Sequence, residues 1–207
     1  GQECTHLKLQ PGEEIRTPLM VLQFWKGNRT DSQNTWRRWM VAHGMPRPGG
    51  KLPEPILAGI SSGDADLAYQ SEENQKIFLD GYQKREIPIQ YWWIDAGWYP
   101  NKGNTWQDLL GTWYADPKRF PQGLRAVSDS VHQRGMKMIV WFEPERVAKG
   151  SWLFENHPEW LLGDGDSRFF NHGNPLANTW LTNHIDNILT QEGIDLYRQD
   201  FAVFARP

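Results

Sequence analysis

Cysteine is almost absent from this sequence, which contains only Cys4. A single thiol excludes an internal disulfide and a cysteine-based zinc site, and it favours a reducing, cytoplasmic location. Long apolar runs are also missing, so no stretch reaches the length of a membrane span, and no signal peptide is expected at Gly1. A formal net charge of -3 over 207 residues gives no basis for binding nucleic acid or an anionic membrane.

Tryptophan, by contrast, is abundant, with 12 residues in the chain. Indole rings are large apolar platforms with a polar edge, and they suit ligands that combine C–H faces with hydroxyl groups. Sugars are the obvious ligands of this class. The alternative is that the rings fill a core or an oligomer interface, and several of the 12 are expected to do so.

The first 45 residues predict a β-hairpin followed by a helix. Residues 5–9 alternate in polarity, residues 10–13 have turn chemistry, and residues 15–24 are rich in β-forming types. Asp31 or Ser32 is expected to cap the helix. Residues 1–45 are therefore expected to form an appendage to the rest of the chain.

From residue 56 the pattern changes to alternating strands and helices, after a Pro- and Gly-rich linker at residues 46–55. The predicted strands lie at residues 56–60, 89–95, 137–143 and 193–201. Alternation of this kind predicts the α/β class with parallel strands. A complete (β/α)8 barrel needs eight strands and roughly 250 residues. Residues 56–207 are thus expected to form half of a TIM-type barrel, a fragment, or an open sheet.

Carboxylates stand at the ends of three predicted strands, namely Asp95, Glu143 and Asp200, and Glu145 follows closely. In β/α barrels the functional groups gather at the carboxyl ends of the strands. Acid–base chemistry needs two carboxyl groups in different environments, and glycoside hydrolysis needs such a pair around the scissile bond. On its own strand, Asp200 is equally consistent with a structural ion pair to Arg198. No cluster of metal-ligating residues stands out, and no cofactor is expected.

Seven short motifs follow one another from residue 89 to the end of the chain. They are Tyr91-Trp92-Trp93-Ile94-Asp95-Ala96-Gly97-Trp98, Gly111-Thr112-Trp113, Asp116-Pro117-Lys118-Arg119-Phe120-Pro121, Trp141-Phe142-Glu143-Pro144-Glu145, His157-Pro158-Glu159-Trp160, Gly173-Asn174-Pro175 and Arg198-Gln199-Asp200-Phe201. In type and order they resemble the motifs of the family 36 glycoside hydrolases, the α-galactosidases or melibiases. Residues 1–45 are similar to the end of the β-sandwich that precedes the barrel in that family.

The resemblance implies a retaining, double-displacement hydrolase that acts on a small carbohydrate, with Asp200 as nucleophile. It also implies that Asp95 and Arg198 bind sugar hydroxyls and that Trp113 walls the sugar subsite. Four residues are expected to support the site: Trp93, Trp98, Glu143 and Glu145. The alternatives are purely structural roles, in which Asp95 caps the loop that follows it and Trp113 packs within its own loop.

The sequence also departs from the family pattern. Ala96 stands where a second Asp is common, Arg198 replaces a Lys, and Ala202 replaces an Asn. The family's acid/base Asp lies on strand six and is expected to be absent. The alternative function is therefore an inactive half-barrel that binds sugar weakly and forms homo-oligomers through its unpaired sheet edges. A nucleotide-binding open sheet has little support, because no Gly-rich phosphate loop lies between Ile60 and Ser71.

Overall fold

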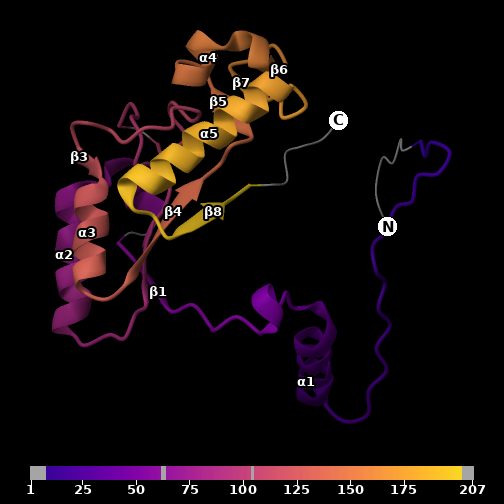
Figure 1. Ribbon diagram of the computed structural model, residues 1–207. Helices are drawn as coiled ribbons and strands as arrows, with labels where there is room; N and C mark the ends of the chain where they lie inside the picture. The colour runs from indigo at the N-terminus through magenta and orange to yellow at the C-terminus, as the bar shows by residue number, and fades with distance from the viewer. Residues whose placement is uncertain (1–7, 62–63, 104, 202–207) are drawn as a thin grey trace. The chain divides into compact units, whose positions relative to one another are not determined.

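The computed structural model describes residues 8–61, 64–103 and 105–201 (Figure 1). The chain divides into two compact units, Gly1–Pro55 and Ile56–Pro207. No helix within the described ranges is both long enough and apolar enough to cross a membrane.

Over residues 8–55 the first unit contains one regular helix, α1 (Arg29–Trp39), followed by a π-helical turn at Met40–Gly44 and a 3-10 turn at Pro48–Gly50. Asn28 begins α1, because its side-chain oxygen accepts hydrogen bonds from the N–H groups of Thr30 and Asp31. In return, Asp31 Oδ2 accepts from the N–H of Asn28 at 2.9 Å. This capping box satisfies N–H groups that have no partner inside the helix. The sequence prediction placed the cap at Asp31 or Ser32, which was wrong.

The β-hairpin expected within residues 1–45 is absent from the part of that range that the structure describes, residues 8–45. The turn itself is present, because the N–H of Glu13 donates to the carbonyl of Gln10 at 3.0 Å. The residues after it belong to no strand, and Leu22 and Phe24 are 83% and 91% exposed. A two-stranded hairpin without a third strand or a covering helix is marginally stable. Residues 5–7 of the predicted first strand lie outside the described residues.

The second unit is built on a parallel sheet whose strands follow one another in the order β1-β2-β4-β8. The strands are β1 (Ala58–Ile60), β2 (Tyr91–Ile94), β4 (Lys137–Phe142) and β8 (Leu196–Gln199). All four were predicted from the sequence, with individual boundaries correct or up to three residues too wide. Together with the helices between them they form half of a (β/α)8 barrel.

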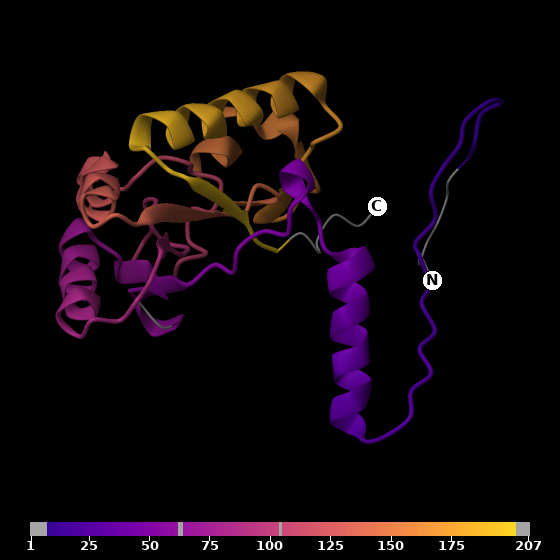
Figure 2. The same ribbon diagram turned by 60° about the horizontal axis from the view of Figure 1, so that its bottom comes forward.

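Helices α2 (Glu72–Lys84), α3 (Arg125–Gln133) and α5 (Pro175–Glu192) connect these strands and run along one side of the sheet (Figures 1 and 2). Ser71 caps α2, since its Oγ accepts from the N–H of Asn74 at 3.2 Å. Asn174 caps α5, because its Oδ1 accepts from the N–H groups of Leu176 and Ala177. Gly193 ends α5 in the left-handed conformation, with φ 65°.

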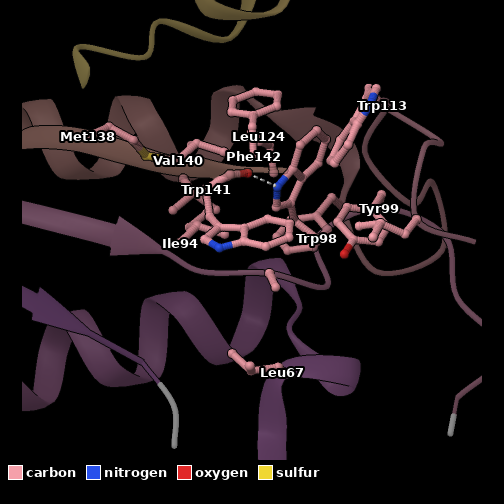
Figure 3. Packing of buried hydrophobic residues seen from close by; sticks show 14 of the residues in the cluster. Leu67, Ile94, Trp98, Tyr99, Trp113, Leu124, Met138, Val140, Trp141 and Phe142 are labelled. Carbon is pink, nitrogen blue, oxygen red and sulfur yellow. Dashed lines mark hydrogen bonds between the residues drawn. The ribbon is translucent and has the colours of Figure 1, made fainter. Parts of the chain in front are cut away.

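The sheet face beneath the helices is a continuous apolar core. Alternation along the strands sends every second side chain to this face, and five of these side chains are fully buried: Trp92, Ile94, Met138, Val140 and Phe142. Figure 3 shows the core continuing over the carboxyl ends of the strands, where Trp98, Tyr99 and Trp113 pack around Phe142 and Trp141. Much of the tryptophan excess is therefore core, which is the alternative that the sequence left open.

The stretch between β4 and α5 folds into a second sheet that the sequence did not predict. It is antiparallel, in the order β5-β7-β6, and consists of β5 (Arg146–Ala148), β6 (Leu161–Leu162) and β7 (Ser167–Phe170). The same stretch contains a short helix, α4 (Trp152–Asn156), and a 3-10 turn at Pro158–Trp160 follows it. A further short extended segment, β3 (Pro121–Leu124), precedes α3, and a 3-10 helix at Asp64–Tyr69 precedes α2.

Candidate active site

Three carboxylates follow the last residues of three adjacent strands. Asp95 comes after β2, Glu143 after β4 and Asp200 after β8. In the observed register Trp141 lies opposite Arg198, and the N–H of Asp200 donates to the carbonyl of Phe142 at 3.0 Å. Because side chains alternate between faces, this register sends all three carboxylates to the face that the helices do not cover. The sequence prediction that they lie at matching ends of neighbouring strands is confirmed.

Asp200 is held by three donors. Its Oδ2 accepts hydrogen bonds from Trp141 Nε1 at 3.0 Å and from Arg198 Nη1 at 2.8 Å. Its Oδ1 accepts from the N–H of Phe201 at 2.9 Å. Partial burial opposes ionisation of this carboxyl, but the three hydrogen bonds outweigh burial and lower the pKa of Asp200 below its ordinary value. Asp200 is therefore an oriented carboxylate at neutral pH.

The residue after Asp200 has a backbone conformation that residues other than glycine rarely adopt. Phe201 has φ 53°, a left-handed value that costs about 1–3 kcal/mol in a non-glycine residue. Its ring stacks on Trp106 with centroids 5.8 Å apart, and the guanidinium of Arg146 lies 4.8 Å from the ring centroid. These contacts hold Phe201 where its N–H reaches the carboxylate of Asp200.

Arg198 joins Asp200 to the aromatic surface of β2. Its guanidinium carbon lies 4.4 Å from the centre of the Trp93 ring, close enough for a cation–π contact. The ion pair with Asp200 keeps both side chains about one-third exposed, at 33% and 35%. Both alternatives weighed from the sequence thus coexist, since the ion pair forms and still leaves the carboxylate open to solvent.

Glu143 and Glu145 lie deeper than Asp200. Glu143 is fully buried, and both of its oxygens accept hydrogen bonds from the guanidinium of Arg146, with Nη2 to Oε2 at 2.7 Å. Burial raises the pKa of Glu143 above its ordinary value, and the bonds from Arg146 only partly offset this rise. Glu145 is 8% exposed, and its Oε1 accepts from Gln199 Nε2 at 3.4 Å. Glu143 thus joins the end of β4 to Arg146 of β5, and Glu145 contacts Gln199 at the end of β8.

Asp95, Trp98 and Trp113, three further residues predicted from the sequence, differ in how much of each side chain is exposed. Asp95 is half-buried, and its Oδ1 accepts from the N–H of Ala96 at 2.7 Å. Trp98 is fully buried and donates from Nε1 to the carbonyl of Trp141 at 2.9 Å, which ties the loop to β4. Trp113 is only 2% exposed within the aromatic core, so its ring has almost no free face for a sugar. This burial favours the packing alternative for Trp113, which is therefore not part of the sugar subsite proposed below.

Two residues that contribute to the site were not singled out from the sequence. Trp141 binds Asp200 directly, and Arg146 binds Glu143. Trp141 comes two positions before Glu143, so alternation along the chain places both side chains on the same face. This alternation could have identified Trp141 from the sequence. Arg146 had no such signal, because it belongs to the antiparallel sheet that was not predicted. Within the described ranges, no group of three or more His, Cys, Asp or Glu residues could hold a metal ion.

Comparison with protein families assigns this arrangement. The model of the melibiase family matches residues 64–202, which is more than half of the chain. The chain belongs to the melibiase family. This melibiase chain is 38% identical over 112 residues to the alpha-galactosidase of Escherichia coli, an alignment that covers 54% of the chain and 16% of the relative. It is 26% identical over 155 residues to alpha-galactosidase Mel36A of Lactobacillus acidophilus. This alignment covers 75% of the chain and 20% of the relative.

Solved structures agree with the fold. The alpha-galactosidase of Lactobacillus brevis superposes with a TM-score of 0.60 and 25% identity, over 70% of this melibiase chain and 20% of that protein. A variant of the GH36 alpha-galactosidase AgaA of Geobacillus stearothermophilus, solved with stachyose, superposes with a TM-score of 0.60 and 22% identity. The superposition covers 74% of this chain and 23% of that protein. The chain spans about a fifth to a quarter of the length of these relatives and of Mel36A. The family resemblance and the half-barrel fold inferred from the sequence are confirmed.

Proposed function

We propose that residues 56–201 form the part of a retaining, α-galactosidase-type hydrolase that binds the terminal sugar and supplies its nucleophile, Asp200. A carboxylate oxygen of Asp200 forms a bond to the anomeric carbon while the bond to the leaving oxygen breaks. Water then cleaves the glycosyl ester and restores the carboxylate. The observation that carries this proposal is the orientation and lowered pKa of Asp200 at the end of β8.

The neighbours of Asp200 suit a sugar ligand. Arg198 offers guanidinium N–H groups beside the carboxylate, and Trp93 offers an aromatic ring beneath them. Asp95 provides a second carboxylate on the same sheet face, which is able to accept from sugar hydroxyls. AgaA was solved with stachyose, a carbohydrate, which supports the same ligand class for this chain.

The preference among sugar epimers is expected to differ from that of the family pattern. Ala96 is 2% exposed, and its methyl group has no hydrogen-bonding capacity where a second carboxylate is common in the family. A site that binds a hydroxyl through a carboxylate discriminates strongly against sugars that lack it. Arg198, a forked donor in place of a point charge, also contacts hydroxyls with a different geometry. We therefore propose that the site discriminates less strongly between sugar epimers at the hydroxyl that this second carboxylate would bind.

An aryl α-galactoside with a good leaving group tests the proposal, because general acid help, worth about 10²–10⁴-fold, is least needed there. The chain, Asp200→Asn and Asp200→Gly are assayed for release of 4-nitrophenol. We expect slow release by the chain and only the buffer rate with Asp200→Asn. Added azide replaces the missing carboxylate of Asp200→Gly as nucleophile and yields the β-galactosyl azide.

Asp186→Asn serves as the matched control, because Asp186 is an exposed aspartate on α5. It should keep the rate of the unmodified chain. Equal rates for the chain and Asp200→Asn, together with no azide product from Asp200→Gly, would refute Asp200 as nucleophile.

A second proposal concerns association. In the described chain, β1 and β8 are the outer strands of the parallel sheet, so each leaves one side unpaired there. Unpaired edges attract further strands. We propose that copies of this chain associate through these edges. Sedimentation velocity measures this directly, and a single monomeric species at all concentrations contradicts it.

A further inference from the structure

The backbone that follows Asp95 is held at four consecutive carbonyl groups. The carbonyl of Ala96 accepts from Gln70 Nε2 at 2.8 Å, and that of Gly97 accepts from Arg119 Nη1 at 2.8 Å. The carbonyl of Trp98 accepts from the N–H of Asp116 at 3.0 Å. The carbonyl of Tyr99 accepts from Arg119 Nη2 at 2.6 Å. Because each of these four carbonyls is bound by a residue from another segment, the position of this turn is fixed relative to those segments.

One guanidinium, that of Arg119, supplies two of these four bonds. Besides the two carbonyls of the turn, Arg119 Nη1 donates to the carbonyl of Gln70 at 2.8 Å. Its Nε forms an ion pair with Asp116 at 2.8 Å, in which the two side chains are 18% and 13% exposed. Arg119 therefore joins the loop after β1 to the turn after β2. A planar fork with five donors on three nitrogens can bind acceptors that lie well apart, whereas a lysine carries its three donors on a single nitrogen.

Gln70, the other donor, is itself fixed from behind. Its Oε1 accepts from Gln75 Nε2 at 3.2 Å, and Gln75 also donates to Ser61 Oγ and accepts from Trp92 Nε1 at 2.8 Å. Gln70, Gln75 and Ser61 are all at most 3% exposed. A buried, fully connected polar network of this kind specifies one geometry. The turn is thus anchored to β1, α2 and β2 together.

We propose that Arg119 is a positioning residue that sets the direction of the Asp95 carboxylate for sugar binding. The proposal rests on the proposed function of this site. Asp95 immediately precedes the held turn, and its Oδ1 accepts from the N–H of Ala96, the first residue of that turn. A shift of the turn therefore moves the carboxylate with it. A misplacement of about 1 Å in a positioned group costs about 10²-fold in reaction rate, and a displaced carboxylate likewise loses its bonds to sugar hydroxyls.

The test replaces the fork but keeps the charge. Arg119→Lys is compared with Arg125→Lys, whose guanidinium forms an exposed i,i+4 ion pair with Asp129 on α3. Affinity for D-galactose is measured by calorimetry. We expect Arg119→Lys to weaken binding by about 10–100-fold and Arg125→Lys to leave it unchanged. Equal affinity of Arg119→Lys and the unmodified chain would overturn the proposal.

A double-mutant cycle separates positioning from general stability. If Arg119 acts through Asp95, then Arg119→Lys should weaken galactose binding no further once Asp95→Asn is present. The same fold-loss in both backgrounds would show that Arg119 acts elsewhere, and would also overturn the proposal. Should Arg119→Lys fail to fold, Asp116→Asn takes its place, because it frees the same guanidinium from its ion pair without removing it.

Amide hydrogen exchange distinguishes this inference from the proposed function. Arg119→Lys should raise exchange in residues 96–99 while β4 stays protected, whether or not galactose binds. If the unmodified chain binds no galactose, the sugar-binding function fails, and exchange alone then judges whether Arg119 holds the turn. Unchanged exchange in residues 96–99 overturns the inference in either case.

Discussion

The two units of the chain use similar apolar patterns with opposite results. Residues 15–24 and the strands of the second unit are both rich in β-forming side chains. In the second unit these side chains are buried beneath three helices, and Trp92 and Val140 are fully inaccessible. In the first unit Leu22 and Phe24 are in solvent, and α1 has no buried residue.

The difference shows that a β pattern becomes a strand only where something covers its apolar face. Each backbone residue that is ordered costs about 1–2 kcal/mol of conformational entropy, which apolar burial must offset. The second unit achieves this with α2, α3 and α5, each of which follows or precedes a strand closely. In the described part of the first unit, α1 follows residues 15–24 but has no buried residue, and it leaves Leu22 and Phe24 exposed.

The largest effect is expected from removing a core indole. Trp92→Ala should lower the free energy of unfolding of the second unit by about 3–5 kcal/mol, because it leaves a cavity and frees the buried Gln75 from its donor. Phe24→Ala, at an exposed ring, should change stability by less than about 0.5 kcal/mol. Urea unfolding followed by tryptophan fluorescence measures both, and similar losses would erase the contrast between the units.

Two glycines with the same backbone angle sharpen the comparison. Gly97 has φ 88° and Gly12 has φ 87°, yet a Cβ on Gly97 would lie 2.0 Å from the carbonyl oxygen of Leu67, whereas Gly12 has nothing within 4 Å. Gly97→Ala should cost more than the roughly 1–3 kcal/mol of backbone strain, because that carbonyl cannot move freely. Gly12→Ala should leave the thermal unfolding of the second unit unchanged. A matching fall in melting temperature for both would be inconsistent with this packing.

Helix caps give an intermediate effect. Asn174→Ala removes the acceptor for two N–H groups at the start of α5, and should lower the stability of the second unit by about 1 kcal/mol. Asn28→Ala removes the equivalent cap of α1 in the first unit. It should reduce helical circular dichroism without altering the denaturant midpoint of the second unit. A shifted midpoint with Asn28→Ala would show that the two units unfold together.

The smallest effect concerns pH. Burial raises the pKa of Glu192 on α5, and hydrogen bonds from the backbone of Arg125 and Leu124 only partly offset it. The folded state therefore holds this proton more tightly than the unfolded state. Its stabilising contribution is complete below the unfolded pKa and is lost as pH rises through the higher folded pKa.

Glu192→Gln should accordingly make the stability of the second unit fall less between acid and neutral pH. Glu13→Gln, in the exposed turn of the first unit, is the charge-matched control. Chemical unfolding at several pH values measures the slope. An unaltered slope with Glu192→Gln would show that this carboxyl does not couple to folding.

Local signals in the second unit were sufficient to predict its parallel sheet. Ser71, Asn174 and Gly193 mark helix ends by their own chemistry, and each acts within a few residues of itself. The antiparallel sheet of β5, β6 and β7 escaped prediction because its strands are only two to four residues long. Arg146 escaped with it, since its contact with Glu143 depends on how that sheet folds back.

The sequence by itself determined the family, the order of strands and helices, and the carboxylates at the strand ends. These features depend on periodicity, capping residues and short motifs, which act over a few neighbouring positions. Only the tertiary structure decided that Trp113 packs in the core, that Trp141 binds Asp200, and that Arg119 holds the turn after Asp95. Those outcomes depend on strand register and on burial between segments far apart in the chain, which no local pattern encodes.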